Sequence, residues 1–403
     1  MTPFPSTILR QKSGIDWNLW CATGGLMLVG AAFIFSATGY QETARGIPWY
    51  NWTAFRQAVA YAIGLGLVVG LNLIDYSRLA RWSLLAYWIS IGLLICVSLF
   101  GTSRHGARRW LDLGPIQFQP SELAKLTFLF ALSGFLCRPT SELRSPTIFL
   151  KGLGLAFLPF ALILKQPDLG SALVFLPATL VMMLLAGVPR NFIVKLIGGA
   201  LVLLSLILVD VLLAPPNWRL IQLQEYQRHR LLVYFDSEFA PSNANAEERL
   251  RAAQLKRKTS WNVEQAMISV GSGGLTGKGW HQGTQHRLGY LPRLGAHNDF
   301  IFSVIAEEKG FLGSLTVLGL YSVILFIGIR IANDARDRLG CLLASGVVTL
   351  LFTHVFVNIG MNIRLMPVTG IPLPLLSAGG TSVICSLVAL GILQNVHLYR
   401  RRY

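Results

Sequence analysis

The sequence predicts an all-α integral membrane protein with about ten transmembrane helices, and three observations support this fold class. Hydrophobic residues make up 53% of the chain and charged residues only 13%, whereas soluble domains carry about 25% charged residues. The mean hydropathy is +0.53. Long apolar runs alternate with polar stretches, and a membrane-spanning helix needs about 20 mostly apolar residues.

Apolar runs of spanning length recur along the chain, which indicates one polytopic membrane domain over residues 1–403. A polar leader precedes the first run and no small-residue cleavage pattern is present, so we expect no cleavable signal peptide. The second, fifth and sixth runs are short or interrupted by polar residues. The predicted spans cover residues 17–37, 56–74, 82–100, 120–137, 147–164, 170–188, 193–213, 311–330, 340–358 and 380–398.

The net charge of +16 reflects membrane topology rather than nucleic-acid binding, because basic residues cluster in alternate loops. The positive-inside rule places such loops in the cytoplasm. We therefore expect a cytoplasmic (inner) membrane protein with both termini in the cytoplasm and a large extracytoplasmic loop, residues 214–310, between helices 7 and 8. The basic residues that define this pattern are Arg10, Lys12, Arg78, Arg81, Arg138, Arg144, Arg190, Arg330, Arg336, Arg338, Arg400, Arg401 and Arg402.

The five cysteines lie in or beside predicted spans, without Cys-x-x-Cys or Cys/His metal spacing. Such cysteines are typical of small apolar packing residues. Neither a disulfide framework nor a zinc site is expected. The five are Cys21, Cys96, Cys137, Cys341 and Cys385.

One carboxylate, Asp299, stands where the long outer loop meets the eighth span. Ionisable groups at membrane depth are costly and indicate function. Basic residues precede it, and Arg109 lies in an outer loop where positive charge opposes the orientation rule. Arginine binds phosphate bidentately, although Arg109 with Trp110 also fits a lipid-headgroup anchor. Together these groups suggest chemistry on a polar group that a lipid carries.

A glycine-rich run, residues 271–279, lies in the same outer loop and ends near Lys278. Closely spaced glycines let backbone N–H groups approach a ligand oxygen, but a plain flexible turn region explains them equally simply. The run is not a P-loop, because Ser272 and Gly279 occupy positions that need glycine and Ser or Thr. It is not a dinucleotide fingerprint either, because Thr276 occupies the third glycine position.

Four further polar residues interrupt apolar sequence. Glu122 and Lys125 are spaced i,i+3 at the start of the fourth span, close enough to pair, so they form either a structural ion pair or a substrate contact. Asp168 either caps the sixth span or has a role in the site. Arg56 opens the second span, where it either snorkels to the surface or binds substrate.

The chain resembles the SEDS family of peptidoglycan glycosyltransferases, whose members include RodA, FtsW and SpoVE. Short motifs match in order along nearly the whole chain, and the set is specific although each motif is short. The proline-punctuated run at the end is more similar to the elongation branch, RodA, than to the division branch, FtsW. The matching segments are Arg56-Gln57, 106–111, 120–125, 166–170, 271–279, 299–302, 306–308, 358–361 and 367–374.

The chain departs from the family pattern at several positions. Before Asp299 the family usually has Pro-Glu-Arg-His-Thr, whereas residues 292–298 here are longer and lack that glutamate. Ala378 replaces a usual tyrosine, and Arg364 replaces a usual glycine. Asp299 itself is retained, so the departures leave the expected catalytic acid in place.

The resemblance implies polymerisation of lipid II into glycan strands at the outer face of the membrane, during cell elongation and shape maintenance. Asp299 is then the general base that takes the proton of the acceptor hydroxyl, in an inverting reaction that borrows the logic of inverting glycosidases. The leaving pyrophosphate needs cations. The candidate residues for binding substrate and pyrophosphate are Arg56, Arg109, Glu122, Lys125, Asp168 and Lys278.

The resemblance also implies partners and a possible ion. The expected partners are lipid II, a class B penicillin-binding protein with transpeptidase activity, and other elongation-complex proteins. A divalent cation, Mg²⁺ or Mn²⁺, is an expectation by analogy, with Asp168 or Asp299 as its ligands. A lipid II flippase or a non-catalytic scaffold of the same complex are the alternative functions. A flippase needs polar residues through the bilayer midplane, and most charges here lie near the outer surface.

Overall fold

The computed structural model describes residues 14–104, 107–113, 116–213, 225–235, 245–291 and 296–400, and it is mostly helical. The first half of the chain forms α1 (Trp17–Ala44), η1 (Trp49–Asn51), α2 (Thr53–Asn72), α3 (Tyr76–Arg81), α4 (Ser83–Phe100), β1 (Thr102–Arg104), β2 (Ala107–Leu113), β3 (Ile116–Phe118), α5 (Pro120–Leu136), α6 (Thr140–Leu143), α7 (Pro146–Lys165), α8 (Leu169–Leu173) and α9 (Phe175–Leu185). The second half forms α10 (Arg190–Leu213), α11 (Glu225–Tyr234), α12 (Ala246–Ser272), α13 (Thr284–Arg287), α14 (Ile301–Asn333), α15 (Arg338–Asn362) and α16 (Gly380–Leu398).

Each of the ten predicted spans falls on helical structure. Among the described residues, eight helices are long and apolar enough to cross a membrane, which makes the chain a multi-pass membrane protein. The fourth predicted span, α5, has 17 residues, and the sixth divides into the short helices α8 and α9. The number of ten crossings therefore stays a prediction.

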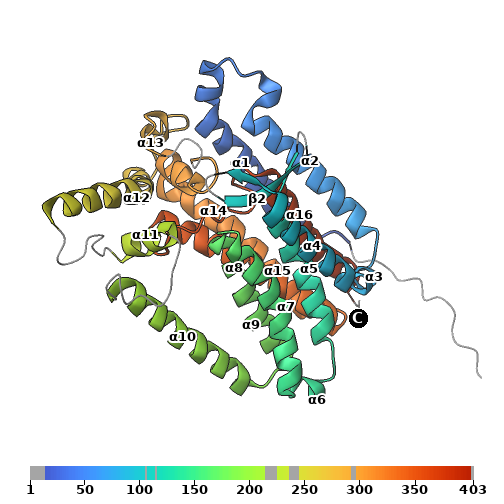
Figure 1. Cartoon of the computed structure of the whole chain (residues 1–403). Coiled ribbons are helices and arrows are strands. Elements are labelled where there is room, and N and C mark those ends of the chain that lie inside the picture. The colour runs from blue at the N-terminus through green and yellow to red at the C-terminus, as the bar shows by residue number, and fades with distance from the viewer. Residues whose placement is uncertain are drawn as a thin grey trace, which may run out of the picture.

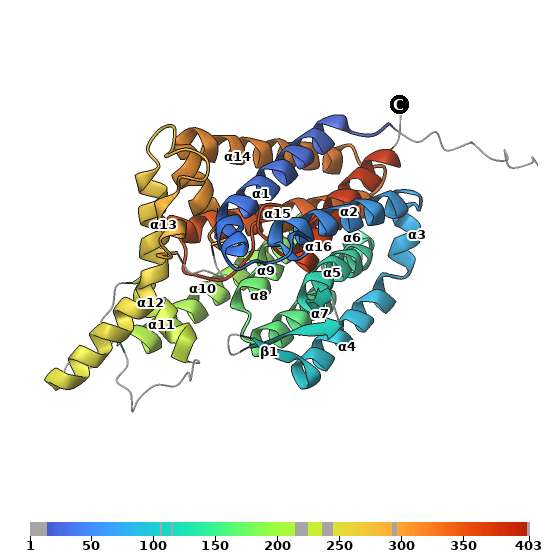
Figure 2. The same cartoon turned by 90° about the horizontal axis from the view of Figure 1, so that it is seen from above.

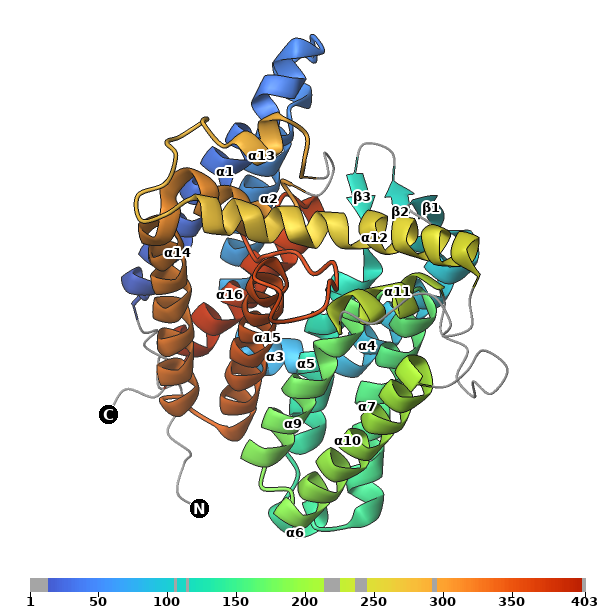
Figure 3. The ribbon, with the colours of Figure 1, turned by 90° about the vertical axis from the view of Figure 1, so that its left-hand side faces the viewer.

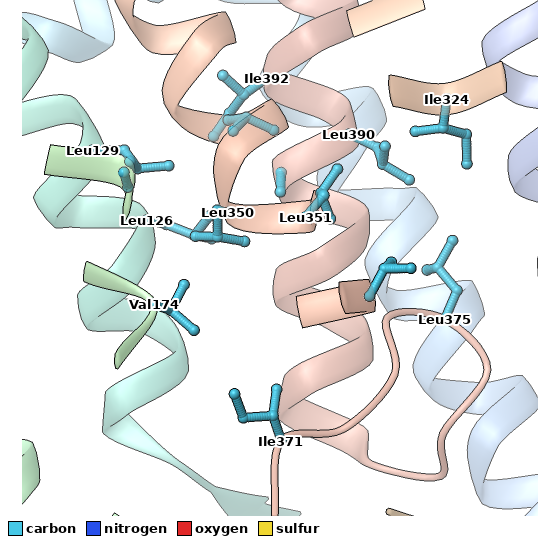
Figure 4. Packing of buried hydrophobic residues seen from close by; sticks show 14 of the residues in the cluster. Leu126, Leu129, Val174, Ile324, Leu350, Leu351, Ile371, Leu375, Leu390 and Ile392 are labelled. Atoms are coloured by element: carbon cyan, nitrogen blue, oxygen red, sulfur yellow. The ribbon is translucent and has the colours of Figure 1, made fainter. Parts of the chain in front are cut away.

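The helices α15 and α16 form the centre of the bundle. Most of the apolar window of each is buried, 72% for α15 and 78% for α16. Apolar side chains from α5, α14 and the segment before α16 pack around them (Figure 4). The helix α10 is the opposite case, because only 6% of its apolar window is buried and it stands away from the bundle (Figure 1). A mostly apolar and exposed helix is suited to contact with lipid.

The loop before α5 has regular secondary structure, whereas an all-α fold predicts an irregular loop here. It forms a three-stranded antiparallel sheet in the order β1-β2-β3. Thr102, Trp110, Ile116 and Phe118 lie on these strands, and β-branched and aromatic residues favour extended backbone. The sequence analysis missed the sheet because strands of three to seven residues are too short for a periodic signal.

The two ends of the bundle differ in structure. The helices α12 and α13 and the strands lie at one end, and α6 lies at the other (Figure 3). Figures 1 and 2 both show the first part of α12 extending beyond the bundle. At the α6 end, Arg338 donates to the carbonyls of Arg138 and Ala186 and so joins α15 to the ends of α5 and α9.

Candidate active site

Asp299 lies in a turn, residues 296–300, that leads into α14. Its main-chain carbonyl accepts hydrogen bonds from the side-chain amides of Asn358, at 3.1 Å, and Asn362, at 3.2 Å. Both asparagines lie one turn apart near the end of α15. The backbone of Asp299 is therefore fixed to the central helix of the bundle.

The segment between α15 and α16, residues 363–379, returns into the bundle and lies against this turn. Two buried tyrosines hold it from opposite helices: Tyr61 of α2 donates to the carbonyl of Leu375, and Tyr321 of α14 donates to the carbonyl of Pro374. The prolines of this segment remove N–H donors that would otherwise need partners. The segment is consequently held rigidly inside the bundle.

Direct hydrogen bonds join the Asp299 turn to the segment 363–379. Ser377 donates to the carbonyl of Asn298 at 2.6 Å, and the N–H of Ala378 donates to the carbonyl of His297 at 2.8 Å. Gln57, which begins α2, donates to the carbonyl of Ser377 at 3.2 Å. Because Ala378 takes part through its main chain, the contact does not depend on a particular side chain at that position.

Arg109 of β2 is held against the turn that precedes α8. Its guanidinium donates to the carbonyl of Gln166 at 3.1 Å and to that of Pro167, and it lies 3.7 Å from the carboxylate of Asp168. The Arg109 side chain is 25% exposed, whereas that of Asp168 is 5% exposed. Arg109 is thus a fixed cation with part of its surface open.

Asp168 caps α8, as one of the two interpretations of its sequence position predicts. Its carboxylate accepts from the N–H of Ser171 at 3.1 Å and from the amide of Gln119 at 3.3 Å. Both contacts position the turn against which Arg109 is held, so the cap and a role in the site are compatible.

Residues 369–371 bring the two acidic turns to one place. A Cβ atom on Gly370 would lie 3.7 Å from Oδ2 of Asp299, and Gly370 has φ +75°. On the other side, a Cβ atom on Gly170 would lie only 2.6 Å from Ile371 and 2.7 Å from the carbonyl oxygen of Thr369. The Asp168 turn therefore packs on residues 369–371 so closely that position 170 needs glycine, and the carboxylate of Asp299 lies beside the same segment at Gly370.

Glu122 and Lys125 form the ion pair that their spacing predicts, with Nζ and Oε1 2.7 Å apart. Both side chains are buried, at 4% and 3% exposure. Lys125 also contacts Nε2 of His354 on α15 at 3.1 Å. The burial and the complete pairing favour the structural interpretation, while a substrate contact stays a prediction.

The glycine-rich run packs on α14 instead of presenting its amides to a ligand. The N–H groups of Lys278 and Gly279 donate to the carbonyls of Glu307 and Glu308, each at 3.0 Å. A Cβ atom on Gly277 would lie 2.2 Å from the carbonyl oxygen of Glu308. The ligand-binding interpretation of these amides is therefore wrong, because neighbouring carbonyls already occupy them.

Lys278 is held by a carboxylate of α14. Its Nζ lies 2.6 Å from Oε1 of Glu307, which also accepts from the N–H groups of Thr284 and Gln285. Arg56 differs, because it is exposed and no partner of its side chain is found among the described residues. The structure places neither cation in contact with Asp299, so their roles in binding stay predictions.

The chain is similar to known proteins over nearly its whole length. The model of the cell cycle protein family FtsW/RodA/SpoVE matches residues 16–402. The chain belongs to this family. It is 37% identical over 311 residues to the peptidoglycan glycosyltransferase MrdB of Escherichia coli K12, which covers 77% of this chain and 76% of the relative. It is 30% identical to the peptidoglycan glycosyltransferase RodA of Treponema pallidum, over 96% of this chain and 99% of the relative.

Solved structures of family members share the fold. One chain comes from the structure described as "Structural coordination of polymerization and crosslinking by a peptidoglycan synthase complex", with a TM-score of 0.76, 31% identity, and coverage of 97% of this chain and 99% of that chain. The rod shape determining protein RodA of Thermus thermophilus has a TM-score of 0.63 and 29% identity, with 99% and 100% coverage.

The acids and cations proposed for the site were predicted from the sequence, but the groups that hold them were not. Asn358 belongs to a matching family motif, yet it received no role. Its spacing of four residues from Asn362 was the available signal, because two amides on one face of an apolar helix need partners. Residues 105–106 and 292–295, which include departures from the family pattern, lie outside the described residues.

The donor set does not form a metal centre. Within the described ranges, no three His, Cys, Asp or Glu side chains gather where they could hold an ion. The carboxylate of Asp168 is engaged by Ser171, Gln119 and Arg109. The described residues therefore offer no ready-made set of oxygen ligands for Mg²⁺ or Mn²⁺, and a bound ion stays a prediction.

Proposed function

We propose that this protein is a peptidoglycan glycosyltransferase that polymerises lipid II into glycan strands at the outer face of the cytoplasmic membrane during cell elongation. One observation carries the proposal: the carboxylate of Asp299 lies beside Gly370, and a partly open cation, Arg109, is held against the Asp168 turn, which packs on the same segment, residues 369–371. The activity named for the relatives MrdB and RodA supports it.

The chemistry needs a base at the attacking oxygen and a cation at the leaving oxygen, on opposite sides of C1. Asp299 takes the proton from the 4-hydroxyl of the acceptor sugar as that oxygen attacks C1 of the donor sugar. The bond between C1 and the pyrophosphate oxygen breaks, and undecaprenyl pyrophosphate leaves with the bonding electrons. Arg109 stabilises the charge that develops on the leaving group. A single displacement of this kind inverts the configuration at C1.

Orientation and partners belong to the same proposal. The basic loops that the positive-inside rule assigns to the cytoplasm include Arg138 and Arg338, which meet at the end of the bundle where α6 lies. Asp299 lies at the other end, which faces outward in this orientation, with both termini in the cytoplasm. A class B penicillin-binding protein is the proposed partner, supported by the synthase complex that contains a similar chain. A divalent ion stays a prediction, and no step is assigned to it.

The test is the conversion of lipid II by the purified protein, with and without its transpeptidase partner. We expect wild type to produce glycan strands in detergent, where no membrane separates two compartments. If wild type forms no strands with the partner present, yet moves lipid II across the bilayer of liposomes, the protein is a flippase. If it does neither, it is a scaffold.

A further inference from the structure

Two buried asparagines on one face of α15 converge on the backbone of the proposed base. Asn358 and Asn362 are both 0% exposed, and each donates to the carbonyl oxygen of Asp299. A buried amide that loses its partners costs about 1–3 kcal/mol. An apolar helix therefore carries such residues only where they hold something in place.

Asn358 differs from Asn362 in what it connects. Its side-chain amide donates to the carbonyl of Asp299 at 3.1 Å and to the carbonyl of Ile371 at 2.7 Å. The two N–H groups of one amide thus join the Asp299 turn to the segment that lies beneath its carboxylate. Ile371 follows Gly370, over which Oδ2 of Asp299 lies.

Asn362, in contrast, is bonded to the Asp299 turn but not to residues 369–371. It accepts a hydrogen bond from Ser303 at 2.6 Å and donates to the carbonyls of Asp299 and Asn358. Asn362 does not reach residues 369–371 through any of these bonds. Loss of Asn358 therefore breaks the direct link between the carbonyls of Asp299 and Ile371, although Ser377 and Ala378 still bond to Asn298 and His297. Loss of Asn362 removes only a second support of Asp299.

We propose that Asn358 is a positioning residue, which holds the carboxylate of Asp299 over Gly370 at the distance and direction that proton transfer needs. The inference rests on the proposed function and deepens it. Asn358 does not touch substrate. It acts by fixing two carbonyls whose residues form the base and the surface beside it, and a displacement of about 1 Å at a reacting group costs up to about 100-fold in rate.

The chain contains a matched control at the other end of the bundle. Asn395 on α16 is also 0% exposed, and its amide donates to two main-chain carbonyls, of Leu71 at 2.9 Å and Ile74 at 2.8 Å. Asn358→Leu and Asn395→Leu each remove two amide-to-carbonyl hydrogen bonds from the same depth of burial. Asn395→Leu also removes the bond that Oδ1 of Asn395 accepts from the N–H of Tyr76 at 2.9 Å, so it should cost the fold at least as much. Only the first change affects the base.

The experiment compares kcat, KM for lipid II and thermal stability of the two variants with wild type. We expect the loss of stability for Asn395→Leu to equal or exceed that for Asn358→Leu. For Asn358→Leu we expect kcat to fall about 10- to 100-fold while KM stays within about twofold, because the base is misplaced but substrate binding is unchanged. For Asn395→Leu, kcat per folded molecule stays within about twofold of wild type.

A kcat for Asn358→Leu that falls no further than that of Asn395→Leu would overturn the inference, since both changes would then act through stability alone. Where Asn358→Leu does not fold, Asn358→Ser keeps one hydroxyl donor, and the same split between kcat and KM decides the question. A wild type that makes no strands overturns the proposed function and this inference together. If wild type makes strands and kcat of Asn358→Leu is unchanged, only the inference about Asn358 is overturned.

Discussion

At the residue scale, the buried pair Glu122–Lys125 illustrates what spacing can and cannot predict. The i,i+3 separation on one helix predicts the contact, and the structure has it at 2.7 Å. The third member, His354, lies 229 residues away in the chain. Only the packing of α5 against α15 brings it to Lys125, and no local pattern contains that information.

Removing one member of this pair separates its structural role from a substrate role. Lys125→Met leaves Glu122 as an unpaired buried charge, which costs about 3–5 kcal/mol of folding stability. The double variant Glu122→Gln/Lys125→Met recovers most of that loss, and polymerisation recovers with it. Thermal unfolding and strand synthesis measure both. A stable double variant that makes no strands would mean that the pair binds substrate.

Asp75, between α2 and α3, has a charge role that the sequence analysis did not predict. It accepts from the N–H of Ser77 at 2.9 Å and pairs with Arg336 at 3.3 Å. Burial by itself would raise the pKa of Asp75, but the hydrogen bonds from Ser77 and the charge of Arg336 outweigh it and leave the pKa lowered. The ionised form is therefore more stable in the folded protein than in the unfolded chain.

The change Asp75→Asn tests this coupling, because asparagine keeps the helix cap and removes the charge. A lowered folded-state pKa contributes stability that is complete above the unfolded value of about 3.9 and is lost as the pH falls through the folded value. We expect the variant to unfold at a lower temperature than wild type at pH 7. The difference should shrink between pH 4 and pH 3, and a difference independent of pH would refute the coupling.

At the scale of elements, the glycine-rich run had two interpretations that the sequence could not separate. Backbone amides that approach a ligand and backbone amides that approach another helix both need glycine. The partner in the structure is the first part of α14, which is broken at Gly310, where φ is +63°. The N–H groups of Phe311 and Leu312 donate back to the run at Gly274 and Leu275.

Two glycine substitutions distinguish close packing from simple flexibility. Gly277 has φ +81° and no room for a Cβ atom, so Gly277→Ala should lower folding stability by more than about 1 kcal/mol. Gly271 is helical and nothing lies within 4 Å of its Cβ position, so Gly271→Ala should be neutral or slightly stabilising. Thermal unfolding of both variants is the measurement. Equal effects would contradict the packing account.

At the scale of the whole molecule, apolar length predicted where helices lie, and all ten predicted spans fall on helical structure. Apolar length could not predict how the residues of the site are arranged. Arg109, Asp168, Asp299 and the segment 369–371 come from distant parts of the chain, and they meet only because α15 and α16 pack at the centre. The sequence therefore predicted candidate residues for the site, and the structure supplied the contacts that relate some of them.

The orientation of the molecule follows from the basic loops and is open to direct measurement. In a cysteine-free background, Gln254→Cys lies on an exposed position of α12 in the predicted outer loop, and Arg144→Cys lies on an exposed position after α6. We expect a membrane-impermeant maleimide to label Cys at 254 in intact spheroplasts and to label Cys at 144 only after lysis. The reverse pattern would invert the topology and place Asp299 on the cytoplasmic side.

The central claim is that Asp299 is the base of a lipid II polymerase, and Asp299→Asn tests it most directly because the side chain keeps its size and loses its proton-accepting charge. The measurement is single-turnover glycan synthesis by wild type and variant, with lipid II binding and thermal stability recorded on the same samples. The account predicts unchanged binding and stability with a rate reduced by at least about 100-fold. Strand synthesis at the wild-type rate by the folded variant would contradict it.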